Sequence, residues 1–577
     1  MFNIYRKLKW FILEEKKRYL LMLFLLLLIS FVALVPAKLL GMAIDMIVNG
    51  GVSVIALTRI VLLMVAVPMF RYGLSFFYNH MMTVEAQKLT YKLRQKYLRH
   101  LFEMDSTFYE TYPKGDLISR VTNDLDAITV AATSLLEGLI FNVGTILFAI
   151  AIMGFSISWP LTLVSVTIMP IALTILNIIR FQKRKYIRIH REIYSEMTEK
   201  VLESVEGMKV IRAYVQEKED LAKQDLAIER DIESWRYIVR FENWFNPLFE
   251  VVYGISYILA FGYGIFQIVN QAITVGELVT FVSYLGMLYG PIISISTIFS
   301  QINNATISVD RFEEIMDKIP TVKDDASSKE IIRFQTIRFK NVTFQYPFDA
   351  QPVIRNITFD LQSGQTIGIV GPTGSGKSTL IRQLLREFNV TSGSILIDGE
   401  PIESYKIDDV RELVGYVPQA HMLFKKTVDE NILIGNPTAS HDQLDKAVKI
   451  ADFEKDILFL TDGYHTMVGE AGSTLSGGQK QRLSIARALV KDPQILILDD
   501  SLSAVDAKTE ENIISHLKEY RGSKTNIIVA HRFSAIRDAD LILVLEKGKI
   551  SQRGTHEELL KQEGWYKMQY IQQISMR

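Results

Sequence analysis

Long uncharged stretches separated by charged ones dominate the first 318 residues. Four of them carry no charged side chain, namely 19–37, 138–179, 251–276 and 278–309. Each is long enough to cross a membrane as a helix, and 138–179 is long enough for two, with 156–160 as the turn between them. A fifth stretch, 54–78, is interrupted by Arg59 and Arg71. The pattern therefore predicts six membrane-spanning α-helices.

The distribution of basic residues predicts how these helices are oriented. Lys and Arg precede the first span and follow the fourth, whereas the connections near 49–51, 156–160 and 270–274 contain neither. Loops rich in Lys and Arg remain in the cytoplasm. The N-terminus and the long charged segments 80–130 and 180–245 are therefore predicted to be cytoplasmic. Both segments have a helical pattern, so we expect them to continue the membrane helices into the cytosol.

The pattern changes after about residue 318. A polar segment is followed by short β-rich runs that alternate with helical stretches, which is typical of an α/β domain. We expect an α-helical membrane domain at 1–318, a linker at 319–331 and an α/β domain at 332–577. The last span ends on the cytoplasmic side, so the C-terminus is predicted there too.

Composition excludes several classes of function. The chain has 577 residues, 64 basic and 64 acidic side chains, and no cysteine. Disulfides, a thiolate nucleophile and Cys-based metal sites are therefore absent. A balanced charge argues against a dedicated nucleic-acid binder, which usually has a basic excess, and we expect no nucleic-acid partner.

The α/β domain contains a sequence typical of a phosphate-binding loop. The segment 371–378 fits G-x-x-x-x-G-K-[ST], with a predicted strand before it and a helix after it. Its glycines let backbone N–H groups converge on phosphate oxygens at a helix N-terminus, while Lys377 adds a positive charge and Ser378 offers its hydroxyl to Mg²⁺. The predicted phosphate-binding residues are Gly371, Pro372, Thr373, Gly374, Ser375, Gly376, Lys377, Ser378 and Thr379.

Two further motifs follow in the same domain. The apolar run 495–498 ends in Asp499, the expected carboxylate partner for Mg²⁺. Between the phosphate-binding loop and Asp499 lies a segment that opens a second helix, whose N-terminus could bind an anion. We call it the signature segment: Leu475, Ser476, Gly477, Gly478 and Gln479. One nucleotide needs only one phosphate cradle, so two in one domain suggest that one of them serves the nucleotide of a neighbouring chain.

With these motifs in this order, nearly the whole chain resembles the ATP-binding cassette (ABC) family, specifically exporters with six spans fused ahead of one cassette. The resemblance implies ATP and Mg²⁺ as cofactors, with Mg²⁺ held by Ser378, Gln419 and Asp499. It implies that Tyr346 stacks on adenine, that Gln419 also touches the attacking water, and that His531 faces the γ-phosphate. It also identifies 466–470 as a contact with the membrane domain, 501–506 as the D-loop, and 115–124 and 206–216 as cytoplasmic loops that carry short coupling helices.

One residue departs from the family pattern. The residue after the Walker B aspartate is normally a glutamate that polarises the attacking water, and here it is Asp500. Its carboxylate is one methylene shorter, and a misplacement of about 1 Å can cost roughly a hundredfold in rate. We therefore expect this cradle to bind ATP and hydrolyse it slowly. The chain is similar to subunits of bacterial heterodimeric multidrug exporters, which implies a second ABC half-transporter that carries the glutamate, in the bacterial plasma membrane.

Alternatives remain open at this point. A homodimer with two slow sites, such as a lipid or peptide flippase, would share the same motifs, and an ATP-gated channel or regulatory subunit is a more remote reading. The resemblance suggests hydrophobic or cationic small-molecule substrates, and membrane lipids surround the spans. Candidate substrate-lining residues are Glu137 and Glu250 together with the aromatic and Met residues Trp244, Phe249, Tyr253, Tyr257, Phe281, Tyr284, Met287 and Tyr289.

Overall fold

The computed structural model describes residues 6–50, 53–469 and 472–575. The chain folds into two compact units, each with its own core. The first comprises Met1–Arg99 and Leu117–Asp317, and the second His100–Asp116 and Lys318–Arg577. The short segment 100–116 therefore groups with the C-terminal half.

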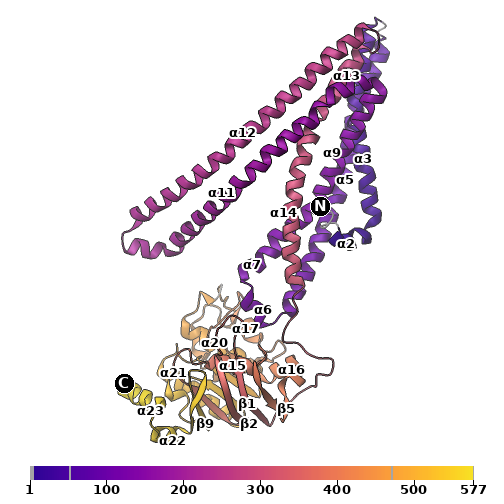
Figure 1. The fold of residues 1–577 in the computed structure, drawn as a ribbon. Helices are drawn as coiled ribbons and strands as arrows, with labels where there is room; N and C mark the ends of the chain where they lie inside the picture. Colours follow the sequence, from indigo (N-terminus) through magenta and orange to yellow (C-terminus); the bar gives the residue numbers. More distant parts are fainter. Residues whose placement is uncertain (1–5, 51–52, 470–471, 576–577) are drawn as a thin grey trace. The chain divides into compact units, whose positions relative to one another are not determined.

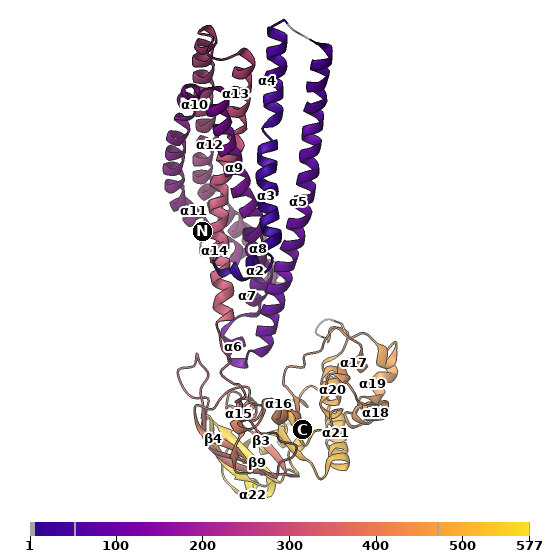
Figure 2. The same ribbon diagram turned by 90° about the vertical axis from the view of Figure 1, so that its right-hand side faces the viewer.

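The first unit is built of helices, three of them very long (Figures 1 and 2). Among its described residues the α-helices are α2 (Lys9–Glu14), α3 (Lys16–Val32), α4 (Val35–Val48), α5 (Val54–Glu103), α7 (Lys114–Ser119), α8 (Leu125–Val130), α9 (Leu136–Ile152), α10 (Trp159–Val166), α11 (Ile168–Ala213), α12 (Glu217–Val269), α13 (Val275–Met287) and α14 (Tyr289–Met316). Three π-helical segments, Arg120–Asp124, Ala131–Leu135 and Met153–Ile157, lie between α7 and α10.

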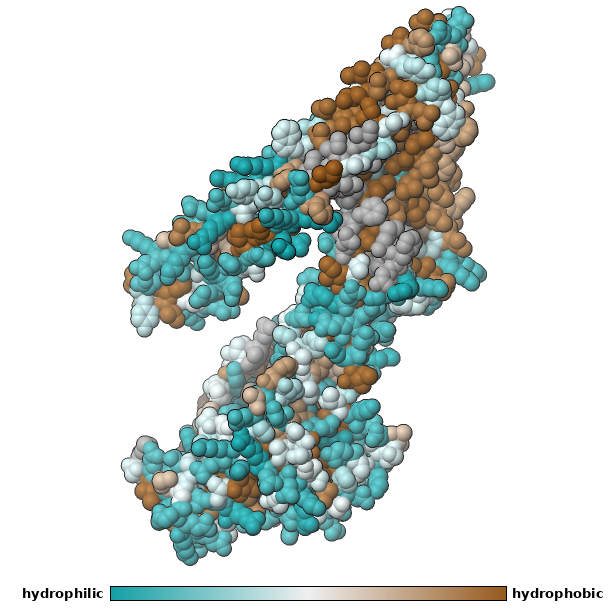
Figure 3. Space-filling view, in the orientation of Figure 1, coloured by the Kyte–Doolittle hydropathy of each residue, from teal (hydrophilic) through white to brown (hydrophobic). Residues whose placement is uncertain are grey.

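The apolar helices match the membrane prediction. Within the described residues, five stretches are long and apolar enough to span a bilayer: Lys16–Val48, Val54–Glu103, Lys114–Ile157, Glu250–Val269 and Val275–Ile295. The shorter apolar helix Trp159–Pro170 lies at the fourth predicted position. Figure 3 shows apolar side chains gathered on the outer surface of the upper helices, with many polar ones along the lower parts of α11 and α12. A surface of this kind is soluble only in lipid, so the unit is a multi-pass membrane domain.

Charged stretches continue three of the apolar helices, as predicted, although the predicted segment 80–130 is broken after Glu103, where α5 ends. Helix α5 has 50 residues, α11 has 46 and α12 has 53. At about 1.5 Å per residue each is roughly twice as long as a bilayer is thick. Helices α11 and α12 run side by side, and the rings of Tyr186 and Tyr237 stack between them at 5.7 Å.

The two cytoplasmic segments that the resemblance links to coupling helices differ in the structure. In the first, the short helix α7 (Lys114–Ser119) overlaps the predicted 115–124. Another short helix, α6 (Ser106–Thr111), directly precedes it, and Asp105 caps α6 by accepting a hydrogen bond from Phe108 N at 3.1 Å. In the second loop, 206–213 is the end of α11, and 214–216 form a turn in which Val215 adopts a φ of 54°. No separate helix forms there within the described residues, because the helical pattern of α11 continues to the turn.

Several predicted substrate-lining side chains pack inside the first unit instead. Phe281, Tyr284 and Tyr253 belong to its hydrophobic core, and the hydroxyl of Tyr253 donates to the carbonyl of Leu285. Trp244 and Glu250 are exposed, and Glu137 is half-buried. The side chain of Phe249 lies outside the described residues. Phe281, Tyr284 and Tyr253 therefore pack in the core, and a role of this group in binding substrate stays a prediction.

The second unit contains two sheets. An antiparallel sheet has the order β2-β1-β4-β5, and a mainly parallel one the order β10-β9-β3-β8-β7-β6. Their bounds are β1 (Thr336–Phe344), β2 (Ile354–Gln362), β3 (Thr366–Val370), β4 (Ser392–Ile397), β5 (Glu400–Pro401), β6 (Val414–Val417), β7 (Ile495–Asp499), β8 (Thr525–Val529), β9 (Leu541–Glu546) and β10 (Lys549–Gly554). The prediction of an α/β domain fused to a helical membrane domain is confirmed.

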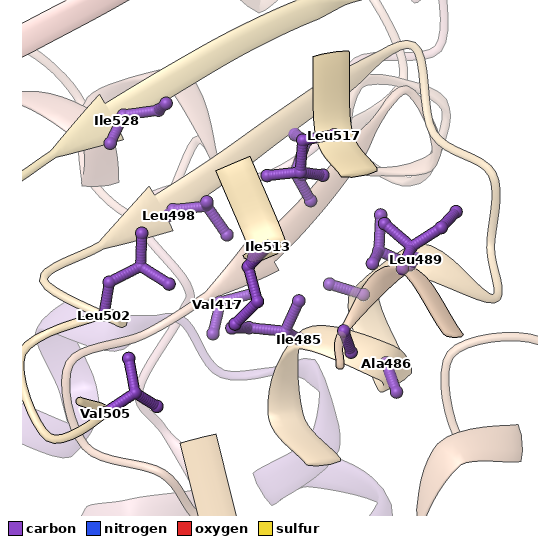
Figure 4. Packing of buried hydrophobic residues seen from close by; sticks show 14 of the residues in the cluster. Val417, Ile485, Ala486, Leu489, Leu498, Leu502, Val505, Ile513, Leu517 and Ile528 are labelled. Atoms are coloured by element: carbon purple, nitrogen blue, oxygen red, sulfur yellow. The ribbon is translucent and has the colours of Figure 1, made fainter. Parts of the chain in front are cut away.

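Helices cover these sheets and complete the core. They are α15 (Lys377–Leu384), α16 (Ile407–Glu412), α17 (Val428–Leu433), α18 (His441–Ile450), α19 (Glu454–Phe459), α20 (Gly477–Leu489), α21 (Ala507–Arg521), α22 (His556–Lys561) and α23 (Trp565–Ser575). In Figure 4, Ile513 of α21 and Ile485 of α20 pack against Leu498 of β7. All five residues of β7 are buried, so the strand that ends in Asp499 is held on both faces.

Candidate functional site

The parallel strands bring the predicted site residues to one edge of the sheet. Strands β3, β8, β7 and β6 are neighbours and run in the same direction. Their carboxyl ends lead respectively into the phosphate-binding loop, His531, Asp499 with Asp500, and Gln419. Ligands of open α/β sheets bind at such carboxyl ends. Residues more than 150 positions apart in the chain therefore meet here.

The phosphate-binding loop depends on glycines whose backbone conformation other residues avoid. Gly371, Gly374 and Gly376 adopt φ values of 148°, 78° and 98°. A Cβ at Gly371 would lie 2.0 Å from the carbonyl oxygen of Leu545. Helix α15 begins directly after the loop, so its free N–H groups point into it. The local sequence thus forms an anion-binding loop in which only glycine fits at position 371.

The cationic and hydroxyl groups of the cradle are in place. Lys377 Nζ donates to the carbonyls of Gly371 and Pro372, both at 2.9 Å. Burial lowers the pKa of the Lys377 ammonium, and the negative charges of Asp500 and Asp499 act against that shift. The hydroxyl of Ser375 is buried and has no hydrogen-bond partner among the described residues. A phosphate oxygen would satisfy this hydroxyl.

Asp499 is held so that both carboxylate oxygens face the cradle. Ser378 Oγ donates to one oxygen at 3.0 Å and the hydroxyl of Tyr416 to the other at 3.4 Å. Burial raises the pKa of the Asp499 carboxyl, while these two hydrogen bonds and Lys377 lower it. A buried carboxylate beside a Ser hydroxyl and a phosphate cradle is the donor set that Mg²⁺ takes in P-loop proteins. The residues present therefore fit a bound nucleotide with Mg²⁺.

Asp500, Gln419 and His531 form a second cluster beside the first. Gln419 Nε2 donates to Asp500 Oδ2 at 3.4 Å, and His531 Nε2 lies 4.0 Å from the same oxygen. The backbone of Asp500 adopts a φ of 49°, in the left-handed region, and its N–H bonds to the carbonyl of Val529 at 3.0 Å. Aspartate tolerates this region better than most residues. The structure thus brings the three predicted catalytic residues together.

Tyr346 is fixed beside the cradle by residues of α15. Its hydroxyl lies 3.2 Å from Thr379 Oγ1 and accepts from Arg382 Nη1 at 3.2 Å. The Arg382 guanidinium also lies 4.7 Å from the ring centroid of Phe388, and Arg382 pairs with Glu110 of α6 at 3.4 Å. The predicted adenine-stacking ring is therefore connected through Arg382 to the short helix α6.

The signature segment lies in another part of the same unit. Ser476 caps α20, and a reciprocal pair of bonds joins Ser476 Oγ to Gln479 N at 3.4 Å and Ser476 N to Gln479 Oε1 at 2.9 Å. Ser476 and Gly477 are exposed. Figure 2 shows α20 with α18 and α19, apart from α15. The structure does not unite this segment with the cradle.

Comparison with known proteins agrees with this geometry. Residues 19–292 match the family "ABC transporter transmembrane region", and residues 354–503 match the family "ABC transporter". The chain is 40% identical over 577 residues to the probable multidrug resistance ABC transporter ATP-binding/permease protein YheI of Bacillus subtilis, covering 99% of this chain and 98% of the relative. The chain belongs to the ABC transporter family.

Other relatives extend the likeness. The multidrug resistance-like ATP-binding protein MdlA of Escherichia coli is 33% identical over 572 residues, covering 98% of this ABC transporter and 96% of MdlA. The solved structure of a bacterial Atm1-family ABC exporter with ATP bound has a TM-score of 0.79 at 25% identity, covering 97% and 98% of the two chains. The cassette of this ABC transporter binds ATP and drives transport.

Two residues near the site were missed by the sequence analysis. Tyr416 donates to Asp499, and Arg382 holds Tyr346. Tyr416 stands three residues before Gln419 on β6, the strand that pairs with β7, so its position was predictable once that pairing was known. Of the predicted contact segment 466–470, Glu470 lies outside the described residues.

Proposed function

We propose that this chain is one half of a heterodimeric exporter that moves drugs or other amphipathic molecules out of the cell, and that the site on its own P-loop binds ATP but hydrolyses it slowly. In this proposal 1–318 form the membrane domain, 319–331 the linker and 332–577 the cassette, with both termini in the cytoplasm. Half-transporters of the ABC family work as pairs, either with another ABC subunit or with a second copy.

The proposal of slow hydrolysis rests on Asp500. A general base must come within hydrogen-bond reach of the proton that it removes. The Asp500 carboxylate ends one methylene short of the glutamate that occupies this position elsewhere in the family, and it faces Gln419 and His531. The residues proposed to hold the nucleotide are in place: Lys377 binds the loop carbonyl of Gly371, and Ser378 donates to Asp499. Tight binding with slow turnover is the expected result.

The signature segment supports the proposal of a second chain. Its helix start is exposed and lies apart from the cradle of the same cassette, so it is available to the nucleotide of another subunit. In a heterodimer it would complete the competent site, in which the partner provides the glutamate.

Exposed apolar side chains in both units also support an assembly. In the first unit, Tyr214 and Val215 at the turn between α11 and α12 are 73% and 79% exposed. In the second, Leu458 and Phe459 of α19 are 82% and 89% exposed. Apolar side chains gathered on the surface of a folded unit mark interaction sites. A partner chain that contacts both surfaces would remove them from water.

ATP and Mg²⁺ supply a multiply charged ligand whose binding favours closed cassettes over open ones, and only such a difference can drive a conformational change. The residues of this chain would bind it through the loop glycines and Lys377, hold the metal with Ser378, Asp499 and Gln419, and stack adenine on Tyr346. The signature residues Ser476, Gly477, Gly478 and Gln479 would bind the partner's nucleotide.

The proposed cargo rests on the names of the relatives and on the membrane unit. YheI and MdlA are both named for multidrug resistance. Glu250 is exposed and Glu137 half-buried near the inner ends of their spans, where a carboxylate can meet a cationic substrate. Hydrophobic or cationic small molecules are therefore the proposed substrates.

The heterodimer is tested by comparing the purified chain with the chain co-expressed with a second ABC half-transporter that has a glutamate after its Walker B aspartate, both in lipid nanodiscs. We expect the chain alone to bind ATP with low, drug-insensitive ATPase activity, and the pair to show drug-stimulated activity. As a matched control, Lys377→Ala in this chain should remove binding at its own site and leave the partner's cradle loaded. Vigorous drug-stimulated hydrolysis by the chain alone would refute the heterodimer.

A further inference from the structure

The segment 530–535, which we call the switch loop, is held by the last helix of the chain. Gln573 of α23 donates from Nε2 to the carbonyl of His531 at 2.6 Å, and its Oε1 accepts from Phe533 N at 3.3 Å. One planar side-chain amide thus pairs with two backbone groups on either side of Arg532. Because both ends of the amide are used, Gln573 fixes the backbone on which His531 is carried.

Helix α23 is itself anchored to the same loop. The Phe533 ring packs edge-on against Tyr566 at 4.8 Å and against Tyr570 at 5.7 Å. Tyr566 is fully buried, and its hydroxyl is hydrogen-bonded to His556 Nδ1 at 2.7 Å. These aromatic contacts hold α23 in position, so the Gln573 amide stays next to the backbone of His531 and Phe533.

Two other side chains of the loop, Arg532 and Ser534, are bound by α21 and the D-loop. Arg532 Nη1 donates to Glu510 Oε2 at 2.8 Å and to the carbonyl of Val505 in the D-loop at 3.0 Å. Ser534 donates to the other oxygen of Glu510, a residue of α21 that is only 2% exposed. His531 lies beside Asp500, with Nε2 4.0 Å from Asp500 Oδ2, and its side chain is 45% exposed.

We infer that Gln573 is a positioning residue for His531, and that the C-terminal helix thereby sets how well this cassette distinguishes a nucleotide with a γ-phosphate from one without. The side chain of His531 receives its direction from the backbone that Gln573 clamps, while Arg532 and Ser534 fix the opposite side of the loop. The inference rests on the proposed function insofar as His531 is taken to face the γ-phosphate.

The test measures binding of ADP and of the non-hydrolysable analogue AMP-PNP, each with Mg²⁺, to the full-length chain in nanodiscs. The readout is the ratio of the two dissociation constants. Gln573→Leu should lower the preference for AMP-PNP by roughly fivefold, the change that the loss of about one net hydrogen bond brings. The matched control is Gln572→Leu, an exposed glutamine on the same helix turn, which should keep the wild-type ratio.

A double-variant cycle with His531→Ala separates positioning from a general structural role. If Gln573 acts through His531, the variant that combines Gln573→Leu with His531→Ala will have the ratio of His531→Ala alone. Should Gln573→Leu fold poorly, Gln573→Glu keeps the size and the acceptor for Phe533 N but cannot donate to the carbonyl of His531, and it should lower the ratio as well.

An unchanged ratio in Gln573→Leu or Gln573→Glu, no effect of His531→Ala, or effects that multiply in the double variant would overturn the inference. Because AMP-PNP is not hydrolysed, the result does not depend on whether Asp500 makes the site slow. Failure of the proposed heterodimer would appear as rapid ATP turnover by the chain alone, which this binding assay does not measure.

Discussion

Replacing Asp500 with glutamate gives the most direct measure of what this side chain costs the site. The change moves the carboxylate outward by about 1 Å, and a misplacement of that size is worth about a hundredfold in rate, or about 2.7 kcal/mol in the activation barrier. A cavity of about 20 Å³ borders Asp500 and His531, so the longer side chain has some room to reach the water.

The backbone conformation at position 500 opposes the change to glutamate. Asp500 adopts a φ of 49°, which aspartate tolerates better than glutamate. We therefore expect Asp500→Glu to raise turnover by about one to two orders of magnitude and to lower the free energy of unfolding by up to about 1 kcal/mol. A thermal melt of the full chain would report the second effect separately from the first.

If the chain forms the proposed heterodimer, the assay follows ATP hydrolysis by the reconstituted pair in which the proposed partner's catalytic glutamate is replaced by glutamine, so that turnover reports only the site built on this chain's P-loop. Asp500→Asn is the matched control, because it keeps the size of the side chain and removes its basicity, and it should abolish the remaining activity. Turnover in Asp500→Glu no faster than in the unchanged pair would refute the reasoning and show that another feature limits the site.

The remaining predictions concern the frame around the site. Gly371→Ala should abolish ATP binding, because its φ of 148° and a Cβ 2.0 Å from the Leu545 carbonyl oxygen leave no room; a nucleotide titration beside a thermal melt checks this, and wild-type affinity would contradict it. Asp105→Ala removes the cap of α6 and the hydrogen bonds that Asp105 accepts from Thr321 Oγ1 at 2.6 Å and Val322 N at 2.9 Å. The local free energy of unfolding should fall by about 1–2 kcal/mol. Hydrogen exchange would report this as faster exchange of the amides at 106–111. Burial raises the pKa of the Asp105 carboxyl, but these hydrogen bonds outweigh it and hold the pKa below its ordinary value. The ionised carboxyl therefore stabilises this contact at neutral pH, and the contribution is lost as pH falls through the lowered pKa. Protection of the amides at 106–111 that does not weaken in acid would contradict this.

Features that depend on one segment of the chain were predictable from the sequence. The length of the apolar runs fixed the membrane helices, because an uncharged run of that length is stable only in lipid. The glycine spacing of 371–378 predicted the cradle, and the signature segment was predicted to open a helix, as it does: Ser476 and Gln479 form the reciprocal cap of α20, which begins at Gly477. The short helix α6 before the first predicted loop was not foreseen, because its cap Asp105 also binds Thr321 from a distant segment.

What the sequence determined by itself was the chemistry of each element: which stretches are stable in lipid, which loop binds phosphate, and that position 500 carries a shorter carboxylate. Only the tertiary structure decided which polar groups from distant segments meet. The strand order β3-β8-β7-β6 places Tyr416 on Asp499, and the docking of α23 places Gln573 on the backbone of His531. Such contacts arise because burying apolar faces brings distant segments together, and every polar group caught between them must then find a partner.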